Sequence, residues 1–436
     1  MRTLFRGVLP LLAAVVSLGF APAACAAQAG SWRPTDGLAS EPGRFDDLAF
    51  ADAQLAFTCS GGGGIYRSRD GARSWERVLL APDEYFRAVD FLDARRGFCS
   101  SLSGALLMTD DGGDTWVDIR DRLPAGTPGM CGLAHAGDTV FAAGIFAAPA
   151  VFARSVDRGV TWTVTALDAL ADGFAEVYFA DARTGFLGGT GPRGAVLLRT
   201  DDGGDSWREA LATDNAIEYV WKVFPVDPVG DLLYASIESF RDETRAARSR
   251  DGGATWEVVP VNPRGLDIQG IGFASPDTGW VAPRSDAGLR TVDGGATWDT
   301  DSDFPPNVNR VVRSPAGVLF AAGPGVYVYD PSAVVGAGPA PPAGPTMTSR
   351  LRVRGGPGTG APFALSLALG KTTNVRVDVL DSAGRHVAEL ARGRLPGGEH
   401  PLDAAPLEAL PPGDYLVALR ADDGFSAARL FLVATR

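Results

Sequence analysis

Residues 200–207 read Thr-Asp-Asp-Gly-Gly-Asp-Ser-Trp, and their eight-residue pattern, Ser/Thr-x-Asp-x-Gly-x-Thr/Ser-Trp, occurs six times in the chain. In this octet the aspartate can accept backbone N–H groups across a tight turn, and the hydroxyl can cap that turn. Glycine supplies a positive φ, and tryptophan a large ring for burial. The structural residues of the six octets are Asp70 and Trp75, Asp111 and Trp116, Asp157 and Trp162, Asp202 and Trp207, Asp251 and Trp256, and Asp293 and Trp298. Only the first copy departs, with Ala72 at the glycine position.

The octets recur with a regular period, because successive tryptophans lie 41 to 49 residues apart. Each interval contains short apolar segments typical of β-strands before the octet, such as residues 88–91 and 97–98, and a further strand pattern after the tryptophan. That makes four strands per unit. A period in the forties with four short strands predicts one β-propeller blade per repeat.

A seventh unit, residues 307–330, has three strand patterns but no octet. The missing part is found at the other end of the chain, where residues 30–36 begin Gly-Ser-Trp-Arg-Pro and resemble the end of an octet followed by an outer strand. We expect residues 30–36 to complete blade seven, which closes the ring and hides its strand edges. The prediction is an all-β chain whose residues 27–330 form a seven-bladed propeller.

The segments outside the propeller have different compositions. Residues 1–26 read as a signal peptide with Arg2 and Arg6, an apolar stretch, and a small-x-small cleavage site at 24–26. Cys25 leaves lipidation as an alternative, although Pro22 stands where a lipobox has leucine. Residues 331–348 form a Pro/Gly/Ala linker, and residues 349–436 carry the alternating strands of a small β-sandwich. We therefore expect an exported protein: periplasmic, cell-surface or secreted.

Composition excludes several classes of function. The 436 residues carry a net charge of −12 without a Lys/Arg cluster, which argues against a nucleic-acid partner. Three histidines and four cysteines leave little for a metal site, and we expect no metal or cofactor. Beyond the signal peptide no apolar run is long enough to span a bilayer. Cys59, Cys99 and Cys131 are expected to be buried thiols, with a disulfide between Cys59 and Cys99 as the alternative.

The octets resemble the Asp-box (BNR-type) repeats of propellers in bacterial sialidases, sortilin-type receptors and photosystem II assembly and stability factors. The last group is the most similar, because it shares the D-G-G-x-T-W boxes and the N-terminal tryptophan strand. This resemblance implies a binding scaffold for membrane-protein assembly. The C-terminal segments V-R-V-D-V-L-D-S-A-G-R, P-G-G-E-H and L-P-P-G-D-Y-L-V resemble Ig-like modules of the flagellar hook-capping type and the type IX secretion sorting type. The terminal lysine and the Pro-Asn-Pro motif of such modules are absent.

We expect a partner to bind on the central face of the propeller, the face opposite the octets, where the chain enters the first strand of each blade. Charged loops on one rim are a usual place for recognition. The candidate residues are Asp46, Tyr85, Arg87, Glu176, Glu218, Tyr219, Lys222, Gln269 and Arg310. The prediction is a monomeric, non-catalytic scaffold that binds a protein or glycan.

The alternative function is a divergent sialidase-like exo-glycosidase or carbohydrate-binding propeller. That chemistry uses an arginine triad, a tyrosine nucleophile with a glutamate, and an aspartic acid. Sialidases also carry Arg-Ile/Leu-Pro before the first box, whereas Arg122-Leu123-Pro124 follows the second octet here. No catalytic residue is therefore predicted.

Overall fold

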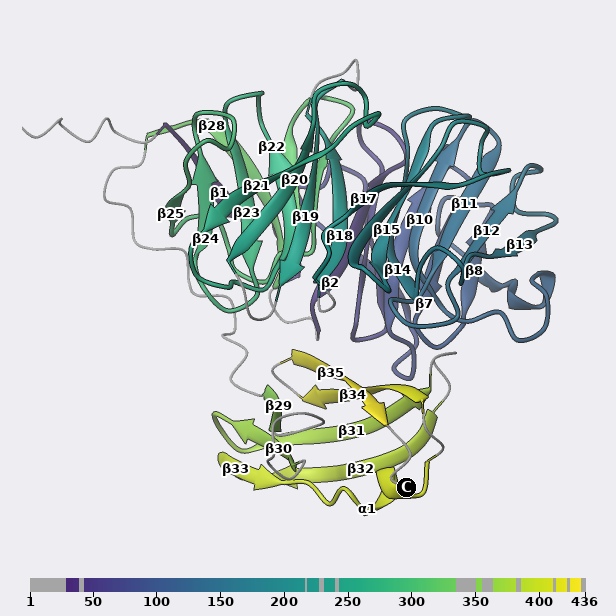
Figure 1. Ribbon diagram of the computed structural model, residues 1–436, viewed down its shortest axis with the longest axis vertical. Helices are drawn as coiled ribbons and strands as arrows, with labels where there is room; N and C mark the ends of the chain where they lie inside the picture. The colour runs from purple at the N-terminus through teal and green to yellow at the C-terminus, as the bar shows by residue number, and fades with distance from the viewer. Residues whose placement is uncertain are drawn as a thin grey trace, which may run out of the picture.

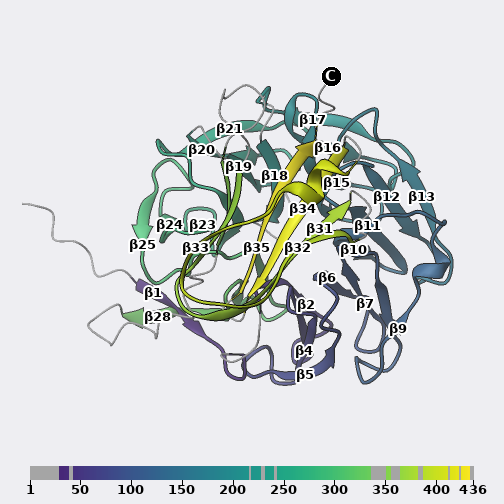
Figure 2. The same cartoon turned by 90° about the horizontal axis from the view of Figure 1, so that it is seen from below.

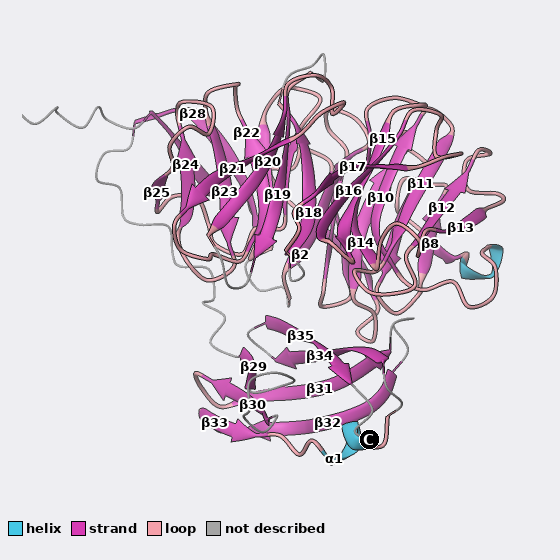
Figure 3. Ribbon diagram, in the orientation of Figure 1, coloured by secondary structure: helices cyan, strands magenta, loops and turns pink. Residues whose placement is uncertain are grey.

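Seven antiparallel sheets of four strands each follow one another around a ring, which confirms the predicted seven-bladed β-propeller (Figures 1 and 2). The computed structural model describes residues 29–38, 43–215, 218–226, 231–239, 243–334, 350–354, 364–381, 386–410, 413–421 and 424–432. The predicted signal peptide and Cys25 lie outside these residues. Helix is confined to two short segments of the described chain, the 3-10 helix η1 (Arg120–Arg122) and α1 (Ala405–Glu408) (Figure 3).

Six blades are contiguous in sequence, and in each the first strand is innermost. Blade 1 contains β2 (Phe45–Phe50), β3 (Ala56–Ser60), β4 (Gly64–Ser68) and β5 (Glu76–Leu80); blade 2 contains β6 (Phe86–Phe91), β7 (Gly97–Ser101), β8 (Leu106–Thr109) and β9 (Val117–Asp118). Blade 3 contains β10 (Met130–Ala136), β11 (Thr139–Gly144), β12 (Val151–Ser155) and β13 (Thr163–Ala166); blade 4 contains β14 (Gly173–Phe179), β15 (Gly185–Gly191), β16 (Gly194–Thr200) and β17 (Arg208–Ala212). Blade 5 contains β18 (Glu218–Pro225), β19 (Leu233–Ser239), β20 (Thr244–Ser249) and β21 (Glu257–Asn262); blade 6 contains β22 (Ile268–Phe273), β23 (Gly279–Pro283), β24 (Gly288–Thr291) and β25 (Asp299–Asp301).

Blade 7 joins the two ends of the propeller. It contains β26 (Arg310–Arg313), β27 (Leu319–Ala322) and β28 (Val326–Val334), and its outer strand is β1 (Ala29–Pro34). The β1–β28 ladder is antiparallel and runs from Ala29 opposite Val334 to Pro34 opposite Tyr327. Trp32 of β1 is buried against the rings of Trp280, Phe304 and Tyr329. Because β28 continues to Val334, the first residues of the predicted linker 331–348 belong to this blade.

Each octet forms the turn between the third and fourth strands of its blade, as blade 2 illustrates. The two Asp111 oxygens accept hydrogen bonds from the Thr115 amide (2.9 Å) and the Thr115 hydroxyl (2.6 Å). The Thr109 hydroxyl donates to Asp111 (2.8 Å) and accepts from the Gly113 amide (2.9 Å). The fourth and fifth octet residues both have positive φ, even where they are Arg158 (φ 61°) and Ala72 (φ 67°). The octet therefore imposes a left-handed turn on residues that disfavour it.

The octet of one blade packs against the preceding blade. A Cβ on Gly113 would lie 2.5 Å from Cε1 of Phe57, which stacks on Phe91 with ring centroids 3.9 Å apart. Trp116 meets the edge of Phe57 with ring centroids 6.3 Å apart. At residue 113, glycine is therefore needed for close approach as well as for its backbone conformation.

The arginine that directly precedes an octet forms a hydrogen bond to the octet of the next blade. In blade 1 the Arg67 guanidinium donates to the Gly112 carbonyl in the next octet (2.9 Å) and pairs with Glu76 and Asp114. The same bond to the next octet is made by Arg154 to Gly203, Arg199 to Gly252 and Arg248 to Gly294. Blade 2 has Met108 at this position, and Arg122 reaches the Gly159 carbonyl (2.8 Å) instead.

The C-terminal region forms two further antiparallel sheets. One contains β29 (Arg350–Arg354), β30 (Ala364–Leu369) and β33 (Gly398–Pro401); the other contains β31 (Thr373–Asp381), β32 (His386–Leu395), β34 (Gly413–Ala421) and β35 (Gly424–Leu432). Leu367, Val377 and Val417 are fully buried in their shared core. Figure 2 shows this domain lying across the propeller, and Arg376 of β31 is 3.5 Å from Asp83 in the loop between β5 and β6. That loop belongs to the central face.

Candidate functional site

The first strands of six blades share a β-bulge where they begin at the central face. In each pairing of first and second strand the register shifts at the second, third or fourth residue of the first strand. The residues at these shifts are Asp46, Arg87, Cys131, Ala175, Trp221 and Gln269. A bulge re-aims side chains, so two successive residues, such as Asp46 and Asp47, can both join the network that fills the channel.

The bulge residues form an outer tier of contacts nearest the central face. Arg87 of blade 2 is ion-paired with Asp46 of blade 1, and its guanidinium lies 5.2 Å from the centre of the Trp221 ring of blade 5. The Asn309 side-chain oxygen accepts from Arg87 (3.3 Å) and from the Trp221 indole (2.6 Å). Arg44 pairs with Asp46 (2.5 Å) and donates to Gln269 (2.7 Å). These contacts join blades on opposite sides of the channel.

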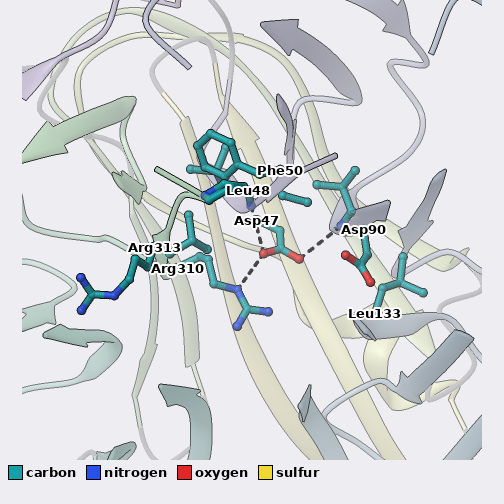
Figure 4. Close-up of a pocket in the computed structure, with 11 residues that line it drawn as sticks. Asp47, Leu48, Phe50, Asp90, Leu133, Arg310 and Arg313 are labelled. Carbon is teal, nitrogen blue, oxygen red and sulfur yellow. Dashed lines mark hydrogen bonds and ion pairs between the residues drawn. The ribbon is translucent and has the colours of Figure 1, made fainter. Parts of the chain in front are cut away.

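An inner tier of four alternating charges lies directly beneath. Arg310 of blade 7 donates to Asp47 of blade 1 (2.7 Å) and to Glu176 of blade 4 (2.7 Å), and Lys222 of blade 5 donates to Glu176 (2.9 Å). Figure 4 shows Arg310 held against Asp47. Burial lowers the pKa of Lys222, and the Glu176 carboxylate opposes that effect. For Arg310, the attraction of Asp47 and Glu176 outweighs burial and raises the pKa. The inner tier is thus a chain of ion pairs across the channel in which two cations balance two carboxylates.

Partly exposed aromatic side chains adjoin the outer tier. Phe146, in the loop between β11 and β12, lies 5.9 Å from Trp221 between ring centroids, and Tyr219 lies 6.1 Å from Trp221. Trp221 itself is 6% exposed. Aromatic rings beside arginine are a composition common to protein-binding surfaces.

An ion pair and a pair of carboxyl groups flank this network in blades 5 and 6. Glu218 is ion-paired with Arg245. Burial and the neighbouring Asp267 carboxylate together raise the pKa of Glu238, which accepts a hydrogen bond from Gln269 (2.8 Å). Arg284 lies 3.5 Å from Asp267. Glu238 is therefore a buried carboxyl group that favours its protonated form.

The predicted site residues are gathered around the channel but are mostly inaccessible. Asp46, Tyr85, Arg87, Glu176, Glu218, Lys222 and Gln269 are all buried, Arg310 is partly buried, and Tyr219 is partly exposed. Six of the nine residues belong to the two tiers. Tyr85 lies beside Asp46 and Tyr219 beside Trp221, whereas Glu218 is paired with Arg245 outside the tiers. The side chains that remain partly exposed at this face are those of Arg44, Phe146, Tyr219, Arg245 and Arg284.

Sequence reasoning missed several members of this site. Asp47, Trp221 and Asn309 belong to the two tiers, and Glu238 and Asp267 form a carboxyl pair beside Arg284. A signal was present, because charged or amide residues recur where first strands begin, but the bulge that turns adjacent residues inward leaves no pattern in one sequence.

Within the described ranges, no group of three His, Cys, Asp or Glu side chains could hold a metal ion. Cys59, Cys99 and Cys131 are free and buried.

Comparison with known proteins gives the following relatives. The chain is 23% identical to the photosystem II stability/assembly factor HCF136 of Arabidopsis thaliana, across 58% of this chain and 77% of that protein. It is 28% identical to the photosystem II assembly lipoprotein Ycf48 of Synechococcus sp. (strain CC9902), across 50% of this chain and 62% of that protein. No protein-family model matches the sequence.

Solved structures share the fold at low sequence identity. A structure of YCF48 bound to D1 peptide has a TM-score of 0.53 and 19% identity, and the match covers 69% of this chain and 96% of that one. An ancestral GH74 enzyme has a TM-score of 0.54 and 15% identity, with 90% of this chain and 60% of that chain covered. In the described part of the chain, no helix is long and apolar enough to cross a membrane.

Proposed function

We propose that this chain is a non-catalytic exported scaffold that binds a protein partner on its central face and assists assembly of a membrane or surface complex. Both curated relatives are photosystem II assembly factors, and one solved structure with this fold holds a peptide. The observation that carries the proposal is the pair of ion-paired tiers. The ion pairs in these tiers connect different blades across the channel, and their charges balance one another. Such cross-links would keep the surface above them rigid, which suits recognition of a partner.

The partner's contact residues are those that the tiers leave accessible. Phe146 and Tyr219 supply aromatic area, and the edges of Arg44, Arg245 and Arg284 supply donors. Each arginine is already held in place by a carboxylate, so binding of a partner costs little conformational entropy of these side chains. Because the C-terminal domain lies across the same face, the partner must bind beside it or displace it.

A photo-crosslinking amino acid at position 146 tests the proposal in cells. The matched control places it at Val156, which is in the same blade but is 66% exposed on the octet face. We expect one protein adduct from position 146 that is absent from position 156 and is lost with Tyr219→Asp. Adducts from position 156 alone, or from neither position, contradict a protein partner on the central face.

A second candidate function, glycoside hydrolysis, is favoured by one observation. Burial and the neighbouring Asp267 carboxylate raise the pKa of Glu238, which is the property that the general acid of a glycosidase needs. Glu238→Gln decides between the two functions. Hydrolysis of xyloglucan or nitrophenyl glycosides that disappears in this variant would establish an enzyme. If the unaltered chain hydrolyses none of these substrates, the enzyme function is contradicted and the role of the carboxyl pair is structural.

A further inference from the structure

A cavity of about 330 Å³ lies in the channel on the other side of the inner tier. Its lining begins at Asp47 and Arg310 and ends at Phe50 and Arg313, the last residues of β2 and β26, and at Pro315 in the turn that follows. The cavity therefore occupies the half of the channel nearer the octet face. The tiers separate it from the central face, so the scaffold role leaves it unused.

The floor of the cavity offers one hydrogen-bond donor. Both Asp47 oxygens are engaged, because Oδ1 accepts from the Leu48 amide (3.0 Å) and from Arg310, and Oδ2 accepts from the Val89 amide (3.2 Å). Arg310 uses Nε toward Asp47 and Nη1 toward Glu176. Among the described residues Nη2 of Arg310 has no such partner, so this nitrogen can donate to a ligand. Asp47 and Glu176 fix its position.

The opposite wall offers one acceptor. Asp90 lies across Asp47 from Arg310, with its carboxylate directed toward the cavity (Figure 4). Its Oδ2 is 2.8 Å from Nδ1 of His135, and no partner among the described residues engages Oδ1. The Asp90 side chain is 17% exposed, so it is in contact with solvent.

The rest of the lining is apolar except for Arg313, whose guanidinium donates to the carbonyls of Phe273 (2.6 Å), Ala274 (3.4 Å) and Gly317 (3.4 Å). Leu48, Phe50, Leu133, Val312 and Pro315 surround the two polar groups. The volume is at the lower end of the roughly 300–1000 Å³ typical of small-molecule sites. It therefore suits one small molecule with an apolar part.

We infer that this cavity binds a small zwitterion, an α-amino acid with an apolar side chain. The ligand carboxylate accepts from Arg310 Nη2, its ammonium group donates to Asp90 Oδ1, and its side chain lies among Phe50, Val312 and Pro315. A simple anion would be repelled by the Asp90 carboxylate, which lines the same cavity. A simple cation leaves the Arg310 donor unpaired in a partly desolvated site. A zwitterion satisfies both groups and adds no net charge.

Isothermal titration calorimetry with the full chain tests this inference, using L-leucine as the probe. Leucine methyl ester lacks the carboxylate, and 4-methylpentanoate lacks the ammonium group. We expect L-leucine to bind at least about tenfold more tightly than either analogue, a ratio typical of losing one charged hydrogen bond. Equal binding of all three compounds, binding of methyl glucoside in their place, or no binding by any compound overturns the inference.

Two variants locate the site. Asp90→Asn removes the ammonium partner and should weaken L-leucine binding about tenfold, while Asp277→Asn in an exposed turn of blade 6 should leave it unchanged. Val312→Phe fills the cavity without altering Asp90 and should abolish binding. The circular dichroism spectrum and the melting temperature of each variant separate loss of the site from loss of the fold. Unchanged binding in both Asp90→Asn and Val312→Phe overturns the assignment to this cavity.

Discussion

Gly113→Ala tests the idea that the octet needs glycine for blade packing as well as for its turn. Gly113 has φ 79°, and alanine in a left-handed conformation costs about 1–2 kcal/mol. The new Cβ would also lie 2.5 Å from Cε1 and 2.9 Å from Cζ of Phe57. Phe57 is fully buried and stacked on Phe91, so it cannot move aside without disturbing the core. Overpacking of this kind costs a further 1–3 kcal/mol or so.

Gly104→Ala is the matched control. Gly104 has φ 98° in the turn of the same blade, but a Cβ there would meet nothing within 4 Å. It should lose only the backbone cost of about 1–2 kcal/mol, whereas Gly113→Ala should lose about 2–5 kcal/mol. Urea denaturation followed by tryptophan fluorescence measures both values. If Gly113→Ala is no less stable than Gly104→Ala, the packing argument is refuted.

Three further predictions concern pH and ring closure. Hydrogen bonds from the seventh octet residue, such as the Thr255 hydroxyl and amide to Asp251, hold the pKa of five octet aspartates at about 2. Their stabilisation is present above the unfolded pKa of about 4 and is lost between about pH 4 and 2, so melting temperatures should fall steeply there, and a flat profile contradicts the octet geometry. The hydrogen bond that His135 donates to Asp90 raises the pKa of His135, so its contribution is present below about pH 6.5 and is lost as pH rises through the folded pKa; His135→Gln should remove that slope from melts recorded between about pH 5 and 8. Trp32→Ala should lower the unfolding free energy in urea by about 3–5 kcal/mol, and a loss below about 1 kcal/mol would show that β1 is dispensable.

The repeat made the fold predictable because the octet is a local structure. Its turn, cap and tryptophan lie within eight residues, and counting its copies with the octet-free unit gives the blades. The seventh blade was predictable because Trp32 repeats the end of an octet in sequence. The arginine before the octet was a readable signal that was overlooked, since it precedes five of the six copies.

The candidate site was less predictable because its contacts join residues from different blades. Arg87 and Trp221 belong to blades 2 and 5, and a single sequence gives no indication that they meet across the channel. Burial was misjudged for the same reason: a charged residue at the start of a strand suggests a solvated rim, but Glu176 and Lys222 neutralise each other inside. The cavity depends on Asp90 and Arg310, whose separation in space no local pattern encodes.

The pairing of β1 with β28 has a consequence for synthesis. Ala29 is opposite Val334, so the earliest described strand to leave the ribosome pairs with one translated some 300 residues later. At about 5–20 residues per second, β1 is without its partner for roughly 15 to 60 s. During that interval its edge is open to pairing with other nascent chains. The ring can therefore close only after the whole propeller has been translated, and a factor that keeps β1 unpaired until then would favour the correct product.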